Sequence, residues 1–267
     1  MGTLEMNNDD YASQIFNAYS SRTQIQPLSS RNVSISETEA YDISRRLTSL
    51  RSWQVVGRKI GFTNKTIWPL YGVNKPMWGP VSSASVQYTD DRTAIIHAKN
   101  FCEPRLEPEI VLGFERAPPL GASLQEIEAC IGWVAPGFEV VHSIYPSWNF
   151  KISDTIAAGG LHGKLIVGPK FHPSHDIAAE LRRQTVILSR NDVEIEKGAG
   201  SDVLEGPVSA IQYLLNGIRS TAGEMPLNAG DIVTTGTMTD AQPLAAGDVW
   251  TANYRGFVNS SLKLEVN

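Results

Sequence analysis

The chain has 267 residues, 42% of them hydrophobic, and a formal net charge of −5 at pH 7. This length allows one or two domains with a substantial core, and the composition is that of an ordinary soluble globular protein. The acidic balance argues against broad electrostatic binding of nucleic acid or of anionic membranes, because both need basic surface. We therefore expect small-molecule partners.

The cysteines and the N-terminus bear on the compartment. Cys102 and Cys130 form no CxxC pair, so neither a disulfide framework nor a thiolate zinc site is supported. The first ten residues show no basic stretch followed by an apolar core, and no apolar run is long enough to cross a bilayer. We expect a cytoplasmic protein.

Two helices are predicted before the first strand. Residues 11–19 place apolar side chains at helical intervals, and a second periodic segment begins after Ser36. Ser36 and Glu39 form a capping-box pattern, in which side chains satisfy free backbone amides of the first turn. These helices and the next strand define an N-terminal region, residues 1–78, ahead of a β-rich catalytic domain, residues 79–267.

The strand-like run predicted over residues 53–64, which closes in a glycine-flanked turn, carries Lys59 among apolar side chains. A buried ammonium must pair with an anion or lose its proton, and both outcomes make lysines functional. A surface lysine whose stem packs on the sheet also fits this pattern. The loop over residues 71–80, which includes Trp78, is rich in turn formers and aromatics, as is typical of a loop that covers a pocket or of a packed connection.

An acidic segment, residues 103–109, leads into the apolar run 110–114. Side chains alternate along a strand, so Glu107 and Glu109 point to the same face. Two close carboxylates repel each other unless a cation neutralises them, and Mg²⁺ is a usual partner of oxygen-only sites. Solvated glutamates on an edge strand, where proline is tolerated, fit the spacing as well.

Further polar residues lie in two later segments. Glu139 stands within the apolar run 137–143, where an unpaired carboxylate is costly, so it extends the acidic pair to a possible triad. The glycines of segment 159–163 permit close approach of the backbone to a ligand, or form an ordinary turn. His162 in that segment is a candidate acid or base, or a loop histidine.

The rest of the chain predicts a hairpin that turns at residues 191–192, a helix over residues 207–216 and strands up to the end. A GxGxxG turn, a P-loop and a nucleophile elbow are all missing, which disfavours the commonest nucleotide-cofactor and hydrolase classes.

Five blocks then carry a resemblance, at residues 59–63, 107–110, 137–141, 154–157 and 230–237. In this order they resemble the 2-keto-4-pentenoate hydratase and 4-oxalocrotonate decarboxylase family of the fumarylacetoacetate hydrolase superfamily, over nearly the whole chain. The resemblance implies an α+β fold, a mixed β-sheet roll with a small N-terminal helical region. It also implies a divalent metal, Mg²⁺ or Mn²⁺, and a 2-oxo acid substrate.

Site residues follow by match to these blocks. The implied metal ligands are Glu107, Glu109 and Glu139, and Lys59 takes the position of the active-site lysine. We predict His162 as a second catalytic residue. The substrate-binding residues that we predict are Trp78, Gly160, Leu161 and Thr237.

The chemistry expected of such a site is lyase chemistry. A 2-oxo acid can chelate a metal through its carboxylate and keto oxygens, so that negative charge on the keto oxygen meets a fixed cation. We predict hydration of a 2-hydroxypenta-2,4-dienoate-type substrate in the degradation of aromatic compounds. Decarboxylation of a 4-oxalocrotonate-like diacid is the alternative, with Arg58, Arg105 or Lys151 as the second cation. An acylpyruvate-type hydrolase and a non-catalytic partner subunit are further alternatives.

The chain also departs from its relatives. Many that hydrate carry an Asp-Asn-Ala-Ser-Ser-Gly run where this chain has residues 158–163, so Leu161 occupies a serine position. We hypothesise that His162, or His142 if it faces the pocket, replaces the lost polar function. Family members commonly form homo-oligomers and some associate with a sister pathway enzyme, so we expect a homo-oligomer.

Overall fold

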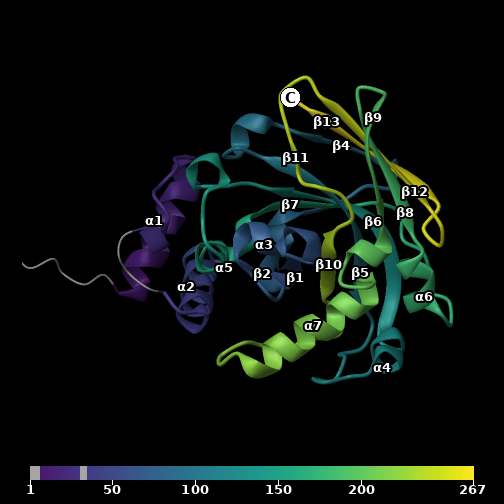
Figure 1. The fold of residues 1–267 in the computed structure, drawn as a ribbon, viewed down its shortest axis with the longest axis horizontal. Helices are drawn as coiled ribbons and strands as arrows, with labels where there is room; N and C mark the ends of the chain where they lie inside the picture. Colours follow the sequence, from purple (N-terminus) through teal and green to yellow (C-terminus); the bar gives the residue numbers. More distant parts are fainter. Residues whose placement is uncertain (1–6, 31–34) are drawn as a thin grey trace, which may run out of the picture.

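The computed structural model describes residues 7–30 and 35–267. It contains an eight-stranded mixed sheet, a five-stranded sheet and surrounding helices (Figure 1), which confirms the α+β class. The helices are α1 (Asn8–Ser21), α2 (Glu37–Leu50), α3 (Trp68–Tyr71), α4 (Leu124–Glu128), α5 (Ile152–Ala157), α6 (Ile177–Arg182) and α7 (Pro207–Ser220).

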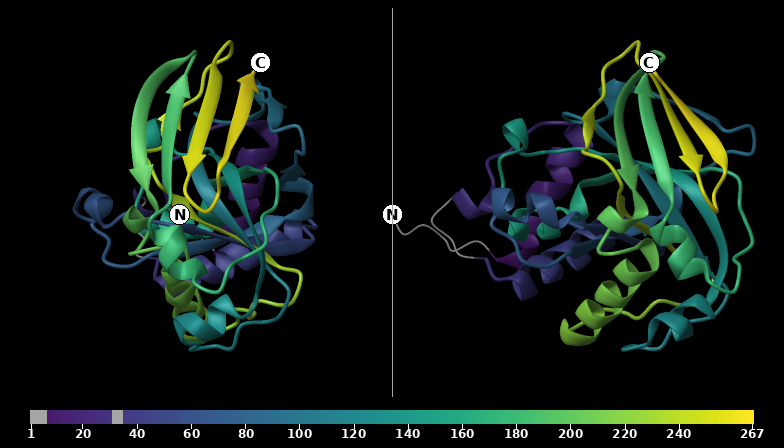
Figure 2. Two further views of the ribbon diagram at one scale, coloured as in Figure 1. Left: turned by 90° about the vertical axis from the view of Figure 1, so that its right-hand side faces the viewer. Right: turned by 45° about the vertical axis from the view of Figure 1, so that its right-hand side comes forward.

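The two sheets divide the strands between them. The eight-stranded sheet runs β2-β1-β10-β5-β6-β7-β3, with β11 paired to β5. Its strands are β1 (Val55–Gly61), β2 (Met77–Ser82), β3 (Val86–Tyr88), β5 (Arg105–Phe114), β6 (Ile131–Val141), β7 (His162–Val167), β10 (Ile232–Thr237) and β11 (Gln242–Pro243). The five-stranded sheet runs β4-β13-β12-β8-β9, and Figure 2 shows strands of this sheet side by side. Its strands are β4 (Thr93–Ile96), β8 (Thr185–Arg190), β9 (Val193–Ala199), β12 (Val249–Arg255) and β13 (Ser260–Val266).

Both predicted N-terminal helices are present. α1 contains the predicted segment 11–19 but begins three residues earlier, because Asn7 and Asp10 form a capping box there. At α2 the Ser36 hydroxyl accepts a hydrogen bond from the Glu39 backbone N–H, and the Ser36 N–H donates to Glu39 Oε2 at 2.8 Å. The capping box predicted from the sequence is therefore confirmed.

β1 and β2 lie in the large sheet, although the sequence analysis assigned them mostly to the region 1–78. β1 pairs in parallel with β10 and antiparallel with β2. The boundary expected at residue 78 falls inside β2, and α1 and α2 lie to one side of the strands (Figure 1). The sheet curls until β2 contacts β7, which forms the roll that the resemblance implied.

One face of the large sheet lines the inside of the roll. Thr234 pairs with both Lys59 and Val111, and Glu107 pairs with Glu139. Residues paired across neighbouring strands share a face, so these side chains all point inward. An apolar cluster fills the rest of that face: Val81, Val111, Ala135, Leu165, Val167 and Ile232. The charged residues are thus gathered at one end of an otherwise apolar face.

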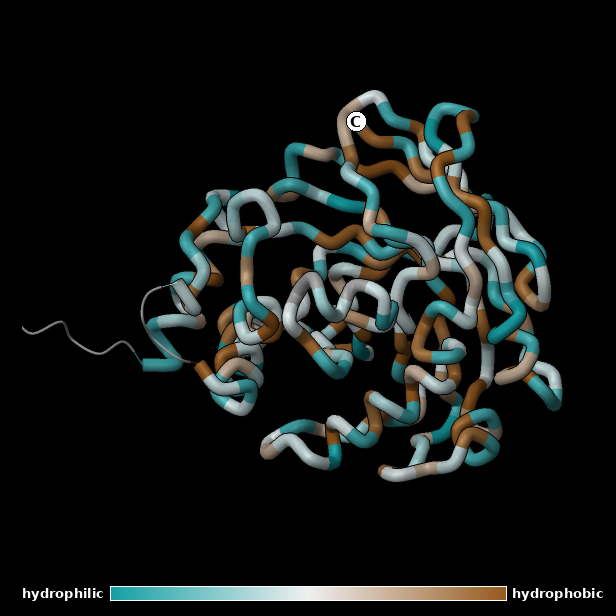
Figure 3. Tube along the Cα trace, in the orientation of Figure 1, coloured by the Kyte–Doolittle hydropathy of each residue, from teal (hydrophilic) through white to brown (hydrophobic). Residues whose placement is uncertain are grey.

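The opposite face of β5 and β6 packs into the main hydrophobic core, together with the five-stranded sheet. In Figure 3 the hydrophobic segments run through the central strands, while hydrophilic segments predominate in the outer loops. From β12, the Tyr254 hydroxyl lies 3.1 Å from the Glu109 carbonyl oxygen and 2.8 Å from that of Gly137. The second sheet therefore braces the two strands that carry the glutamates.

The C-terminal elements follow the prediction. Asn191 and Asp192 both have positive φ and join β8 to β9, as the predicted hairpin requires. The helix predicted over residues 207–216 is α7, which extends to Ser220. Among residues 7–30 and 35–267, no helix is long and apolar enough to cross a membrane.

Candidate metal centre

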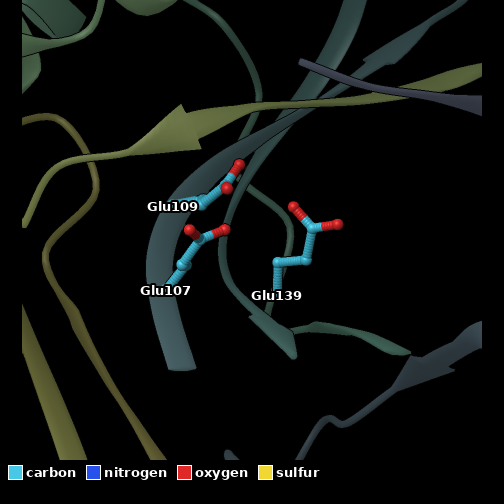
Figure 4. Close-up of side chains that lie close together, drawn as sticks. All are labelled: Glu107, Glu109 and Glu139. Atoms are coloured by element: carbon cyan, nitrogen blue, oxygen red, sulfur yellow. The ribbon is translucent and has the colours of Figure 1, made fainter. Parts of the chain in front are cut away.

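Three glutamates converge on the inner face of the roll. Glu107 and Glu109 project from β5, and Glu139 faces them from β6 (Figure 4). One carboxylate oxygen of each lies within 4.8 Å of the others. Glu109 and Glu139 are fully buried and Glu107 is half-buried. The spacing in the sequence and the register of two strands together produce the predicted cluster.

Glu109 is fixed through one oxygen only. Its Oε2 accepts hydrogen bonds from the Thr234 hydroxyl and, at 2.7 Å, from the Gly236 backbone N–H. Gly236 has φ +107°, and a Cβ there would lie 1.9 Å from Thr63 Oγ1, so only glycine fits. Glu109 Oε1 is buried and has no hydrogen-bond partner among the described residues.

Glu139 shows the same arrangement. His162 Nδ1 lies 2.8 Å from Oε1, and Lys59 Nζ lies 3.2 Å from Oε2 in an ion pair. Oε2 receives no hydrogen bond of regular geometry from the residues described. Glu109 therefore presents one buried oxygen without a partner, and Glu139 one buried oxygen whose polar contact is the Lys59 ammonium. Buried carboxylate oxygens that receive no hydrogen bond are costly unless a ligand occupies them.

In this cluster three carboxylates lie close to one lysine, so negative groups outnumber positive ones. Burial raises the pKa of Glu107 to about 7, and it holds the pKa of Glu109 well above its ordinary value. Burial disfavours the charged form of Glu139 too, but Lys59 and His162 keep its pKa below the ordinary value. Burial lowers the pKa of Lys59, yet the three glutamates outweigh it and the pKa is raised. A divalent cation would supply the missing charge, and an oxygen-only donor set suits Mg²⁺ or Mn²⁺.

A cavity of about 420 Å³ adjoins this cluster and is lined by Lys59 and Glu107. Its lining also includes Gly160, Leu161 and Thr237, three of the four residues predicted to bind substrate. Gly160 is needed for close packing, since a Cβ there would lie 2.8 Å from Lys59 Cδ. The apolar part of the wall is formed by Ile60, Phe62, Met77, Trp148, Phe150 and Leu161.

Trp78, the fourth residue predicted to bind substrate, lies elsewhere. Its ring stacks on Tyr41 with centroids 4.3 Å apart, and its Nε1 donates to Glu224 at 2.9 Å. It lines a second cavity, between α2 and the chain that follows α7. Side chains alternate along β2, so the inward position belongs to Met77, and Trp78 is not placed to touch a substrate in the first cavity.

The two candidate histidines do not line the cavity either. His162 is buried behind Glu139 and touches that carboxylate, so it lies one layer away from a substrate. His142 packs between Tyr19 and Phe101, and burial lowers its pKa to about 3. Neither is placed to exchange a proton directly with a substrate in this cavity.

Arg105 and Trp148 are cavity residues to which the sequence analysis gave little or no weight. The Arg105 guanidinium lies 4.3 Å from the Trp148 ring centroid, and both line the cavity. Arg105 shares the parity of Glu107 and Glu109 along β5, so the alternation of the strand could have identified it. Of the other cations considered, Arg58 lines the second cavity and Lys151 is exposed outside both.

With the geometry established, comparison with known proteins gives the family. Residues 72–263 match the family described as "Fumarylacetoacetate (FAA) hydrolase C-terminal". This match covers more than half of the chain, so the protein belongs to the fumarylacetoacetate hydrolase family. The family assignment made from the sequence is confirmed.

Individual relatives narrow the resemblance. The chain is 28% identical over 254 residues to 2-hydroxyhexa-2,4-dienoate hydratase of Comamonas testosteroni, which covers 94% of each protein. It is also 28% identical over 231 residues to 4-oxalocrotonate decarboxylase of Pseudomonas sp. strain CF600, covering 84% of each. A hydratase and a decarboxylase thus match this chain at the same identity, the hydratase over the larger share of the chain.

Solved structures agree on the fold. The 4-oxalocrotonate decarboxylase of Pseudomonas putida G7, complexed with magnesium and adipate, superposes with a TM-score of 0.87 at 25% identity and 97% coverage of both chains. Fumarylpyruvate hydrolase of Pseudomonas aeruginosa, in complex with Mn²⁺ and pyruvate, has a TM-score of 0.59 at 13% identity, over 78% of this chain and 88% of that one. The second likeness concerns the fold alone.

Proposed function

We propose that the protein is a metal-dependent lyase of small 2-oxo or 2-hydroxydienoic acids, and that it hydrates a 2-hydroxypenta-2,4-dienoate-type substrate. The observation that carries this proposal is the cluster of three glutamates beside a cavity, in which two buried carboxylate oxygens receive no hydrogen bond from the described residues. The similarity to hydratases and decarboxylases of short unsaturated acids supports the same class of reaction.

Each part of the site has a distinct role in this proposal. Glu107, Glu109 and Glu139 would hold the metal, which when bound would act as a Lewis acid toward the keto and carboxylate oxygens of the substrate. Lys59 reaches the same cavity and keeps its proton, so its ammonium can bind the substrate carboxylate. It can also donate a proton to carbon as the dienol becomes a ketone, before water adds to the conjugated enone.

Arg105 favours decarboxylation of a diacid as a second candidate reaction. Its guanidinium makes no hydrogen bond or ion pair with the residues that the structure describes, and it faces the same cavity as Lys59. A second carboxylate on the substrate would give the half-buried Arg105 guanidinium a bidentate partner. The relative whose structure superposes best among those compared above is a decarboxylase complexed with a diacid, which supports the same alternative.

The reaction test uses purified, metal-loaded protein with 2-hydroxypenta-2,4-dienoate and, separately, with 2-oxohex-3-enedioate. Loss of dienoate absorbance without release of carbon dioxide, with the hydrated product identified by mass, is the expected result. Release of carbon dioxide from the diacid would instead establish the decarboxylase. Absence of both signals from a metal-loaded protein would contradict the proposed lyase and leave a binding role.

We also propose a homo-oligomer. β9 is the edge strand of the five-stranded sheet, and Val193 on it is 63% exposed and Ile195 37% exposed. Apolar side chains on an open strand edge support association between copies of the chain. Sedimentation of the wild type and of Val193→Lys would test the assembly, which we expect the lysine to weaken.

We also propose a reducing compartment such as the cytoplasm, which the two free, buried cysteines, Cys102 and Cys130, support.

A further inference from the structure

A chain of three side chains runs from the back of the metal centre into the interior. His162 opens β7, and its Nδ1 lies 2.8 Å from Glu139 Oε1. Its other ring nitrogen, Nε2, lies 2.8 Å from the Ser85 hydroxyl, and that hydroxyl lies 2.8 Å from the Ser82 carbonyl oxygen. The side chains of His162 and Glu139 are fully buried. The imidazole is thus held at both nitrogens.

The contact with His162 determines which oxygen of Glu139 faces the glutamate cluster. His162 occupies Oε1, so a cation in the cluster can approach only Oε2, the oxygen that faces Lys59. Glu109 has the same division, because Thr234 and Gly236 occupy its Oε2 and leave Oε1 open. Two buried glutamates therefore each offer a single oxygen to the cluster.

We propose that His162 is a positioning residue that holds Glu139 as a one-oxygen metal ligand, and that it thereby favours Mg²⁺ over Ca²⁺. This inference rests on the metal centre of the proposed function. It replaces an acid or base role for His162, whose ring lies behind Glu139 and outside the cavity lining.

The preference follows from the different needs of the two ions. Mg²⁺ is small, binds oxygens at short distance and takes carboxylates through one oxygen, whereas Ca²⁺ takes six to eight oxygens and readily uses both oxygens of a carboxylate. A Glu139 released from His162 could turn and offer both oxygens. That freedom would help Ca²⁺ and would cost Mg²⁺ a preorganised ligand.

The test measures dissociation constants of Mg²⁺ and Ca²⁺ by calorimetry on the chelator-treated full chain, for the wild type and three variants. His162→Leu removes the donor at similar volume, and we expect it to weaken Mg²⁺ binding by about 10–100-fold. Ca²⁺ binding should weaken less, so the ratio of the two constants shifts toward Ca²⁺. His162→Asn keeps an N–H donor near the Nδ1 position and should restore the ratio, while Ser85→Ala should shift it partway.

If His162 has a purely structural role, its loss should weaken the binding of Mg²⁺ and of Ca²⁺ by the same factor. The ratio of the two dissociation constants would then be unchanged. An unchanged ratio in folded His162→Leu would therefore overturn the inference. If that variant does not fold, Ser85→Ala decides, and an unchanged ratio there would overturn it equally. Failure of the wild type to bind either ion would overturn the metal centre itself, a result distinct from wild-type binding with unaltered variants.

Discussion

Lys59 keeps its charge although it is only 4% exposed, because three glutamates surround it. A lysine that burial deprotonates acts as a base or nucleophile. Lys59 stays protonated, so it can act only as a cation or as a proton donor. A bound metal would add a second cation beside it. Lys59 and the metal would then repel each other while both attract a substrate carboxylate.

Lys59→Met should therefore separate turnover from metal binding. We expect turnover to fall by about 10²–10⁴-fold, the usual contribution of a positioned proton donor. Mn²⁺ should bind as tightly as to the wild type or more tightly, because a neighbouring positive charge is removed. Steady-state kinetics and the electron paramagnetic resonance signal of free Mn²⁺ measure the two effects. Lys263→Met, an exposed lysine that pairs with Glu265 on the second sheet, is the control. Unchanged turnover in Lys59→Met would remove this residue from the reaction.

Arg105 offers a prediction about substrate class. If a diacid is bound, Arg105→Met should raise its KM by about 10–100-fold, because a hydrogen-bonded charge pair contributes about 1.5–3 kcal/mol. The KM of a monocarboxylic dienoate should change little. Arg58→Met is the matched control, since Arg58 precedes Lys59 on β1 and faces the other cavity. Equal changes for both substrates would contradict a distal-carboxylate role.

At the scale of elements, β10 supports the metal centre from the side. Its register shifts between Thr234 and Thr237, and this irregularity turns the Gly236 N–H toward Glu109. The segment η6 (Gly159–Leu161) supports it from another side, because Gly160 lets the Lys59 stem pass. The glutamates are therefore positioned by strands that belong to distant parts of the sequence.

Gly236→Ala tests the contribution of β10. A Cβ at this position would clash with Thr63, so we expect a loss of about 1–3 kcal/mol in the free energy of unfolding, together with weaker metal binding. Gly230→Ala is the control, because Gly230 also has positive φ (+92°) but no atom lies within 4 Å of its Cβ position. Denaturant unfolding and metal titration of both variants separate the clash from backbone strain. Equal losses in the two variants would contradict a specific role for Gly236.

Local patterns in the sequence predicted most of the elements and part of the site. Three predicted features depend only on near neighbours in the sequence, and all are present. They are the capping box at Ser36, the hairpin at residues 191–192 and the shared strand face of Glu107 and Glu109. The sequence placed Trp78 in a pocket-covering loop, whereas Trp78 lies on β2 and its ring stacks on Tyr41 beside the second cavity. Ser85 gave no signal, because its contact with His162 joins residues that are 77 positions apart.

At the scale of the whole molecule, the acidic cluster couples metal binding, pH and folding. The pKa of Glu107 is about 7 in the folded chain, and that of Glu109 is also raised, so the native state binds more protons than the unfolded state above the ordinary glutamate pKa. Stability from these two groups is present at acidic pH and is lost as pH rises from about 4.5 through about 7. Glu139, whose pKa is lowered, has the opposite sign.

This cluster should therefore make the metal-free protein melt at a lower temperature at about pH 8 than at about pH 5.5. Mg²⁺ at about 100 times its dissociation constant should restore about 2.7 kcal/mol at the higher pH, and less at the lower pH where protons compete. Calorimetric melting with chelator and with Mg²⁺ at both values measures this. Glu107→Gln removes one titrating group and should flatten the dependence. An equal effect of Mg²⁺ at both values would contradict the coupling.

The most direct test of a metal-dependent lyase is one titration, in which Mg²⁺ is returned to chelator-treated protein while bound metal and consumption of 2-hydroxypenta-2,4-dienoate are both recorded. Turnover should rise in proportion to bound metal and reach its limit at a single ion per chain, held by Glu107, Glu109 and Glu139. Full turnover by protein that holds no metal would contradict this function.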